Sequence, residues 1–402
     1  MKKWTIIMVS MFVIVLLTSC SFFGGKDKTV LDEQDKTTLA SPQVKPSPTR
    51  EAAQIPLAWQ DNGIFKEYYE KAYEKLSAMT MMDKVGQMFL ARCPQKDAVE
   101  LIKVCRPGGF VLFGVDFKEK TKKEVIEILS SYQEASSIPM ILSTDEEGGT
   151  VVRVSSNISF AKTKFKSPQQ VFKNGGMDGI RKDAANKAKL LKELGIHVNL
   201  APVADVSVDP DDYIYARTFG KEAEETKKYV EAVVKAHQAE GVSCTLKHFP
   251  GYGNNVDTHT GVAEDKRLYE TFENSDFIPF QGGIEAGVHS ILVSHNIVEC
   301  MDQSLPASLS PEVHRILREE LEFTGVIMTD DLAMDAIKVY TKGEHPAVQA
   351  VLGGTDMMII TDLKEGYQQV LAAVNSGKIK EEQVNRAAFR ILAWKYAIGL
   401  LQ

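Results

Sequence analysis

Eight runs of consecutive apolar residues alternate with amphipathic stretches from about residue 60 to the end of the chain. Continuous rather than alternating hydrophobicity is typical of strands that are buried on both faces, as in parallel sheets. The stretches between them carry apolar residues at helical spacing, which predicts a helix after most strands. The predicted strands are 85–91, 109–114, 140–144, 198–203, 242–246, 290–294, 325–329 and 357–361. The predicted helices are 121–135, 179–194, 221–240, 274–286, 310–321, 365–376 and 381–398.

This alternation predicts an α/β fold. Eight strand–helix units in roughly 340 residues fit a (β/α)8 TIM-type barrel, whose usual size range includes this length. A doubly wound open sheet has a similar alternation. The regular spacing of the units favours the barrel, and we expect residues 57–402 to form a single catalytic domain of this type.

The N-terminus predicts export and a lipid anchor. Lys2 and Lys3 precede an apolar stretch, 4–17, that is too short for a comfortable membrane span. Small residues then lead to Cys20, as in a bacterial lipoprotein signal. We expect residues 1–19 to be a signal peptide and Cys20 to carry the lipid, which places the protein on the extracytoplasmic face of the cell membrane. Residues 20–56 are polar and proline-rich, and are expected to be a disordered linker.

Charge and cysteine content limit the other partners. The net charge of -7 and the lack of a basic cluster argue against nucleic acid as a partner. Cys244 and Cys300 lie in or near apolar strands and are expected to be core thiols. A disulfide between Cys93 and Cys105 is possible in an exported protein, but spacing alone does not decide it.

Polar residues gather directly after five of the predicted strands. In a barrel, all of these strand ends meet at one rim, where active sites lie. The sequence therefore predicts a ring of charged groups around one cavity. The clusters are 145–147, Asp205 with the loop to Arg217, 247–248, 294–296 and 330–331.

The stretch 247–259 is the most informative of these clusters. Lys247 and His248 follow an apolar strand, and glycine, proline and asparagine residues then exclude regular structure. The stretch ends in Asp257 and His259, whose side chains project to one side of extended backbone. A carboxylate beside an imidazole suits general acid/base chemistry near neutral pH.

Asp330 and Asp331 are adjacent carboxylates at the end of the seventh strand. Because paired carboxylates repel each other, one is usually ionised while the other is structural. Helix capping explains one of them and leaves the other available for chemistry.

Together these segments resemble glycoside hydrolase family 3, in its β-N-acetylhexosaminidase branch. The resemblance covers about residues 60–400 and includes the order and spacing of the motifs. It departs from the family at Tyr252, where the pattern is usually Gly-His-Gly, at Thr150, where an arginine is customary, and in a loop that is one residue shorter before Asp257. The matching segments are 145–149, 201–206, 217–220, 247–259 and 329–334.

The resemblance implies roles for individual residues. Asp330 would be the nucleophile, His259 the acid/base and Asp257 the residue that orients His259. The remaining implied residues would bind the sugar: Asp145, Arg153, Arg217, Lys247 and His248. The resemblance implies neither a cofactor nor a metal, although His295 with His248 and His259 could suggest a metal-dependent hydrolase.

The implied activity is a retaining exo-β-N-acetylglucosaminidase that acts, as a monomer, on GlcNAc-containing saccharides and muropeptides in peptidoglycan turnover. One alternative keeps the fold and uses phosphate as the acceptor, as a β-N-acetylglucosaminide phosphorylase would. Another is a non-catalytic, cell-wall-binding lipoprotein.

Overall fold

The computed structural model describes residues 54–255, 263–334, 337, 340, 341 and 343–402. The predicted signal peptide, Cys20, most of the linker, and the pair Asp257 and His259 lie outside these residues. Within the described residues, no helix combines the length and hydropathy needed to cross a bilayer.

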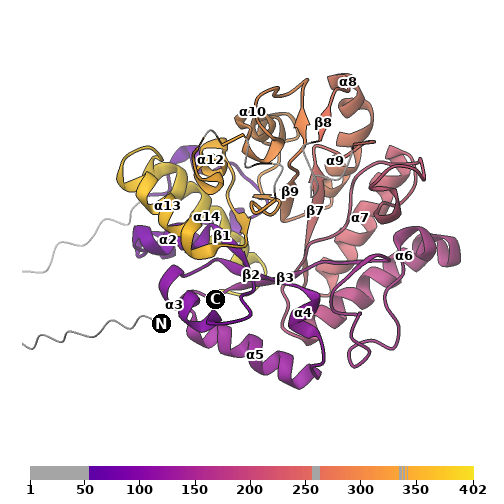
Figure 1. The fold of residues 1–402 in the computed structure, drawn as a ribbon, viewed down its shortest axis with the longest axis horizontal. Helices are drawn as coiled ribbons and strands as arrows, with labels where there is room; N and C mark the ends of the chain where they lie inside the picture. The colour runs from indigo at the N-terminus through magenta and orange to yellow at the C-terminus, as the bar shows by residue number, and fades with distance from the viewer. Residues whose placement is uncertain (1–53, 256–262, 335–336, 338–339, 342) are drawn as a thin grey trace, which may run out of the picture. The chain divides into compact units, whose positions relative to one another are not determined.

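Eight parallel strands form the predicted barrel, and helices lie around them (Figure 1). Their order in the sheet is β11-β9-β7-β6-β3-β2-β1-β12. The ring closes between β11 and β12, where Met328 bridges Met357 and the Thr329 N–H donates to the Met357 carbonyl at 3.1 Å. This closure distinguishes the barrel from the open sheet. The strands are β1 (Phe89–Arg92), β2 (Gly109–Leu112), β3 (Ile141–Thr144), β6 (Val198–Asn199), β7 (Ser243–Phe249), β9 (Ser290–Val293), β11 (Val326–Thr329) and β12 (Met358–Ile360).

The helices follow the strands as the alternation predicts, and the structure also contains two short sheets and several short helices. Two short sheets lie outside the barrel: β4 (Glu146–Gly148) with β5 (Val151–Val152), and β8 (Glu264–Asp265) with β10 (Ile297–Val298). The α-helices are α1 (Tyr69–Ser77), α2 (Met81–Gln87), α3 (Ala98–Cys105), α4 (Gly114–Phe117), α5 (Lys122–Ala135), α6 (Pro168–Glu193), α7 (Ala223–Ala239), α8 (Tyr269–Thr271), α9 (Phe277–Glu285), α10 (Pro311–Arg315), α12 (Pro346–Gly353), α13 (Leu363–Asn375) and α14 (Glu381–Ala397).

The predicted strand 85–91 is wrong in its first half. Thr80 and Asp83 form a capping box that begins α2, so Val85 lies in a helix, and β1 starts only at Phe89. A short apolar run cannot by itself distinguish a buried helical turn from a strand.

Three predicted helices also differ from those observed. Helix α6 begins at Pro168 rather than 179, because Ser167 caps it, and it is interrupted at Gly176, where φ is 58°. The predicted helices 274–286 and 310–321 each combine an α-helix, α9 or α10, with a five-residue π-helical segment, Phe272–Asp276 or Ile316–Glu320.

Strand β7 also extends beyond the predicted strand 242–246. The strand does not stop at Leu246 but continues through Phe249, whose carbonyl accepts from the Ser294 N–H at 2.9 Å. Its register against β9 shifts between Leu246 and Phe249, which is a bulge. Bulges re-aim side chains, and here both Lys247 and His248 line the same cavity.

The four cysteines in the described part of the chain are free. Cys93 and Cys105 are both buried and unpaired, so a disulfide between them is excluded in this structure. Cys244 is buried in the core as predicted, whereas Cys300 is exposed because it lies in the turn after the buried strand β10, and its prediction as a core thiol is wrong.

Candidate active site

A cavity of about 570 Å³ opens at the carboxyl-terminal rim of the barrel. This volume lies within the range of small-molecule sites. Six of the predicted site residues line it together: Asp145, Arg153, Arg217, Lys247, His248 and Asp330. Arg92, Phe113, Glu147, Tyr213 and Met334 are among the further lining residues. Asp257 and His259 lie outside the described residues, so their place relative to the cavity stays a prediction.

Four charged side chains form one wall of this cavity. The Lys247 ammonium lies 2.6 Å from Asp145 Oδ1 and 2.7 Å from Glu147 Oε1. Arg217 donates from Nε and Nη2 to the two oxygens of Glu147, at 3.0 and 2.7 Å. The side chains of Lys247 and Glu147 are only 4% and 2% exposed. Buried charges of this kind are held in place by their partners.

These contacts keep Glu147 and Lys247 ionised. Burial alone would raise the pKa of Glu147, but the charges of Lys247 and Arg217 outweigh it and hold that pKa well below its ordinary value. In the opposite direction, burial would lower the pKa of Lys247, and Asp145 and Glu147 raise it. An ammonium has three N–H groups, so Lys247 keeps one for a ligand. The wall therefore offers fixed, charged hydrogen-bonding groups to a polar molecule in the cavity.

Asp205 orients His248 in this wall. One oxygen of Asp205 lies 2.8 Å from His248 Nδ1 and accepts the His248 backbone N–H at 3.1 Å, and the other accepts the Tyr252 N–H at 2.8 Å. Arg217 Nη2 lies 3.3 Å from His248 Nε2. Because a guanidinium only donates, a hydrogen bond between Arg217 and His248 requires Nε2 to accept, and Nδ1–H then donates to Asp205.

The two adjacent aspartates at the end of β11 have different environments. Asp331 is held by its neighbours: it accepts from the Ala333 N–H and from the Thr361 hydroxyl, both at 3.0 Å. Asp330, which lines the cavity together with Asp331, accepts the Asp331 N–H at 2.8 Å and no other N–H or O–H among the described residues. Asp331 is thus held by a local turn and by Thr361, whereas the Asp330 carboxylate remains available for chemistry.

Asp330 is ionised at neutral pH. Burial would raise its pKa, but His295, His248, the Asp331 N–H and Lys247 hold that pKa below its ordinary value of 3.8. Of these, the Lys247 charge and the backbone N–H persist at every pH at which the protein would function. An ionised carboxylate that faces a cavity can act as a nucleophile or stabilise a developing cation.

His295 has a structural role. It is fully buried, with Nδ1 at 2.7 Å from the Ser308 hydroxyl and Nε2 at 3.0 Å from the Asp331 carbonyl, so it ties the end of β9 to that of β11. In the part of the chain that the structure describes, no group of three or more His, Cys, Asp or Glu side chains is arranged to hold a metal.

Glu146, although it neighbours the wall, is turned away from the cavity. Its carboxylate accepts the backbone N–H groups of Arg153 and Val154, at 2.9 and 2.7 Å, and the Ser155 hydroxyl. Burial raises its pKa despite these bonds. Glu146 thus closes the β4–β5 hairpin, from whose end Arg153 reaches the cavity.

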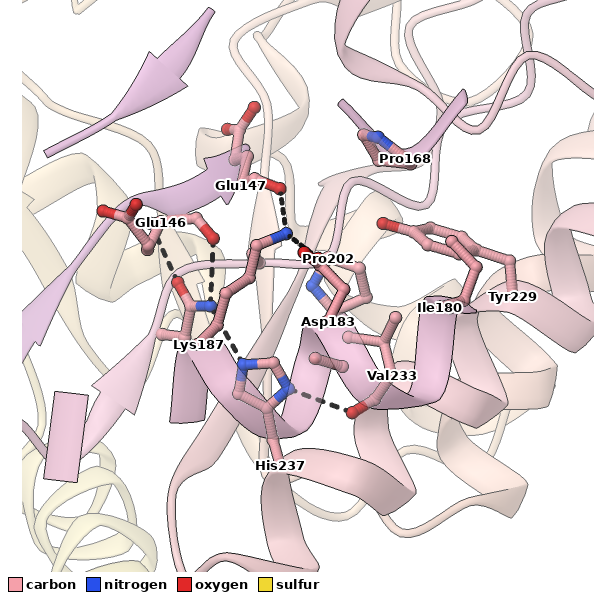
Figure 2. A pocket seen from close by; sticks show the side chains of 13 residues that line it. Glu146, Glu147, Pro168, Ile180, Asp183, Lys187, Pro202, Tyr229, Val233 and His237 are labelled. Carbon is pink, nitrogen blue, oxygen red and sulfur yellow. Dashed lines mark hydrogen bonds and ion pairs between the residues drawn. The ribbon is translucent and has the colours of Figure 1, made fainter. Parts of the chain in front are cut away.

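A second polar layer supports this segment from behind (Figure 2). Lys187 on α6 donates to the Glu147 carbonyl at 2.7 Å and pairs with Asp183. Asn199 bonds to the backbone of Glu146 on one side and to His237 on the other, at 3.1 Å. The cavity among these groups has only about 10 Å³, space for at most one water molecule. The polar side chains around this small cavity hold the backbone of Glu146 and Glu147 in place, and the cavity itself is too small to bind a substrate.

A closed (β/α)8 barrel with a charged, sugar-sized cavity at its rim defines a barrel enzyme, and comparison with known proteins assigns its family. Residues 80–394 match the family model described as glycosyl hydrolase family 3 N terminal domain. The chain belongs to this family. The predicted resemblance to family 3 and the predicted class of enzyme, a glycosidase of the β-N-acetylhexosaminidase type, are thereby confirmed.

Individual relatives agree with this assignment. A beta-hexosaminidase of Idiomarina loihiensis is 31% identical over 299 residues, which are 74% of this chain and 87% of the relative. One of Nitrosomonas eutropha is 28% identical over 275 residues, 66% of this chain and 77% of the relative. A solved family 3 beta-N-acetylglucosaminidase of Paenibacillus sp. str. FPU-7 superposes with a TM-score of 0.75 at 29% identity, over 80% of this chain and 63% of that chain. The chain thus spans less than two thirds of that structure.

Several residues of the site could not be assigned a role from the sequence, and Glu147 and Asp205 are the two among them that hold predicted site residues in place. Both lie in the matching segments 145–149 and 201–206. Each acts by binding a side chain from a different strand or loop, Glu147 through Lys247 and Arg217, and Asp205 through His248. The sequence signal that could have identified Glu147 is charge balance. If Lys247 and Arg217 are buried at the rim, buried carboxylates must lie beside them.

Proposed function

We propose that this protein is a retaining exo-β-N-acetylglucosaminidase that removes terminal β-linked GlcNAc from peptidoglycan-derived saccharides. The observation that carries the proposal is the position of the Asp330 carboxylate in the same cavity as the wall of Asp145, Glu147, Arg217 and Lys247. The names of the relatives, beta-hexosaminidase and beta-N-acetylglucosaminidase, support the choice of sugar.

In the proposed mechanism the wall binds the sugar hydroxyls, and the anomeric carbon lies toward Asp330. The Asp330 carboxylate attacks this carbon, the bond to the leaving sugar breaks, and a protonated His259 gives its proton to the departing oxygen. The resulting ester between Asp330 and the sugar is then cleaved by water, from which His259 takes a proton. Two displacements at one carbon retain the β configuration. Asp257 would orient His259 through the cycle.

Hydrolysis of aryl β-GlcNAc and aryl β-glucoside by the whole protein tests this function. We expect at least ~10-fold higher kcat/KM for the GlcNAc substrate, since recognition of a substrate amide is worth more than 1 kcal/mol. Proton NMR during the reaction should show the β anomer of GlcNAc first. Equal rates on the two substrates, or release of the α anomer, would refute the proposal.

The acid/base part has its own test. His259→Ala should slow cleavage of a GlcNAc disaccharide by at least ~100-fold, in the usual range for loss of general acid catalysis. A dinitrophenyl glycoside needs no protonation to leave, so its cleavage should stop instead at the ester, and azide should restore turnover. If both substrates are impaired equally and azide has no effect, His259 is not the acid/base. Glu146 is then a poor substitute, because it is buried against the β4–β5 hairpin.

The proposed location rests on the N-terminal sequence alone. A lipid on Cys20 would hold the enzyme at the outer face of the membrane, next to peptidoglycan. Cys20→Ala should move the protein out of the membrane fraction without loss of specific activity. Continued membrane retention of a correctly processed Cys20→Ala protein would count against the anchor.

A further inference from the structure

A second cavity, which the proposed mechanism does not use, lies outside the barrel between β2 and the helices α4 and α5. Successive residues of a strand face opposite sides, so Val111 and Phe113 line the catalytic cavity, whereas Leu112 between them lines this outer cavity. The outer cavity has a volume of about 220 Å³. It holds more than a single water molecule but is smaller than the roughly 300–1,000 Å³ of drug-sized sites.

The interior of the outer cavity is apolar and chemically inert. Burial raises the pKa of the Cys93 thiol to about 12, so this group stays protonated and is not a nucleophile. Its sulfur lies 3.8 Å from the Tyr132 hydroxyl. A sugar, which carries hydroxyl groups on every side, would find few partners here. The interior is formed by the buried side chains of Leu112, Phe117, Val125 and Leu129.

Asp116 brings a negative charge to the outer cavity, and no cation of the described residues forms an ion pair with it. One of its oxygens accepts from Gln95 Nε2 at 2.6 Å and the other from the Phe113 N–H at 2.7 Å. Burial raises the pKa of Asp116, although these two bonds and the charge of Lys120 oppose the change. A carboxylate can accept about four hydrogen bonds, so Asp116 has room for further donors.

Lys120 brings a positive charge to the mouth of the same cavity. It is half-buried, and it also lines an open depression on the surface of α5. Its ammonium forms no ion pair or hydrogen bond with another described residue, because it lies beyond contact distance of Asp116, and Glu124 is bound to the N–H and hydroxyl of Thr121. Two opposite charges that do not neutralise each other by contact therefore lie beside one apolar interior.

We infer that the outer cavity binds a free α-amino acid with an apolar side chain. The ammonium of the ligand pairs with Asp116, its carboxylate pairs with Lys120, and its side chain fills the space beside Leu112 and Leu129. This arrangement neutralises both charges of the cavity and both charges of the ligand. The inference concerns a site outside the catalytic cavity and is independent of the proposed glycosidase activity.

Calorimetry of the whole protein with L-leucine and two analogues tests the site. One analogue, 4-methylpentanoate, lacks the ammonium, and the other, 3-methylbutylamine, lacks the carboxylate. Leucine should bind saturably to one site. Each analogue should bind at least ~10-fold more weakly, because the loss of either charge leaves one charged group of the cavity without its partner.

Two variants assign the two charges. In Asp116→Asn the preference for leucine over 4-methylpentanoate should fall to about 1, while the asparagine oxygen still accepts the Phe113 N–H. In Lys120→Met the preference for leucine over 3-methylbutylamine should fall to about 1. Lys118→Met is the matched control, since Lys118 is an exposed lysine in the same loop, and it should keep the wild-type affinities.

Two further variants locate the ligand and keep the test decisive if Asp116→Asn fails to fold. Ile128→Trp places a large ring at the mouth of the outer cavity and should abolish leucine binding with every charge in place. Asp330→Asn alters the catalytic cavity and should leave leucine binding unchanged.

Three results would overturn the inference. They are a folded wild type that does not bind leucine, equal affinity for leucine and either analogue, and leucine binding that survives in Ile128→Trp but is lost in Asp330→Asn.

Discussion

Asp330 and Asp331 show how far the environment of a residue, rather than its type, determines its role. The two have the same side chain and both line the cavity, but the Ala333 N–H and the Thr361 hydroxyl bind Asp331, whereas the described hydrogen bond to Asp330 comes from the Asp331 N–H. Glu146 and Glu147 form a second such pair, one bound to backbone N–H groups and the other to Lys247 and Arg217. Each pair is distinguished in part by groups that are distant in sequence, Thr361 for Asp331 and Lys247 with Arg217 for Glu147.

The low pKa of Asp330 predicts the acidic side of the pH profile. Its carboxylate is required in the ionised form, and its pKa lies below 3.8, so kcat/KM should begin to fall only below about pH 4. Lys247→Met removes one of the charges that lower this pKa, and should move the acidic midpoint upward. Lys182→Met, at an exposed position on α6, should leave the midpoint in place. A wild-type midpoint at pH 5 or higher would contradict the assigned state of Asp330.

The segment that follows β7 packs closely against its neighbours at two glycines, Gly251 and Gly253. A Cβ atom on Gly251 would lie 2.1 Å from Asp276 Oδ1, and one on Gly253 would lie 2.5 Å from Arg267 Cζ. Arg267 also donates to the Gly251 carbonyl at 3.3 Å and pairs with Asp265 and Asp276. Asp265 in turn accepts from Asn255 at 2.8 Å. Both ends of the segment that contains the predicted Asp257 and His259 are therefore fixed to one ion-pair cluster.

Gly251→Ala should disturb this anchor. Gly251 has φ 130°, where an alanine is strained, and its new methyl group would displace Asp276. We expect a loss of about 1–3 kcal/mol in the free energy of unfolding, as for strained backbone positions, and at least ~10-fold lower kcat/KM on a disaccharide. Gly175→Ala is the control, since nothing lies within 4 Å of its added Cβ and a helical alanine is favoured. Wild-type stability and activity in Gly251→Ala would show that the anchor is unimportant.

The order of strands and helices could be predicted from hydrophobic patterns alone, but the ends of elements could not. Val85 belongs to α2 because of the Thr80 capping box, and β7 runs past Leu246 because the ends of its neighbouring strands continue to bond it. The site was predictable where residue type and strand end coincide, as at Lys247, His248 and Asp330. Glu147 and Asp205 escaped prediction because their roles depend on partners brought in by the fold.

The buried amine of Lys395 should make the free energy of unfolding of the whole protein depend on pH above neutrality. Lys395 on α14 is fully buried, and its Nζ donates to Gln87 Oε1 at 2.5 Å. Burial lowers its pKa to about 7, whereas the unfolded chain keeps a value near 10.5. Between these two pH values the unfolded state binds more protons, so the free energy of unfolding should rise with pH.

Chemical denaturation at pH 7 to 10 measures this contribution. Wild type should gain a few kcal/mol over that range from Lys395, and Lys395→Met should show a correspondingly smaller rise. Lys182→Met should keep the wild-type slope, because its side chain is exposed in both states. Equal slopes for wild type and Lys395→Met would mean that Lys395 is not titrating as its burial requires.

The proposed covalent bond between Asp330 and the sugar can be trapped as a stable ester. A fluorinated GlcNAc analogue with a good leaving group should inactivate the enzyme because it slows the hydrolysis of the ester more than its formation. Peptide mapping by mass spectrometry should then find the sugar on Asp330. Asp331→Asn should still be labelled, and Asp330→Asn should not. A label on Asp331, or turnover that proceeds without any labelled carboxylate, would contradict the account.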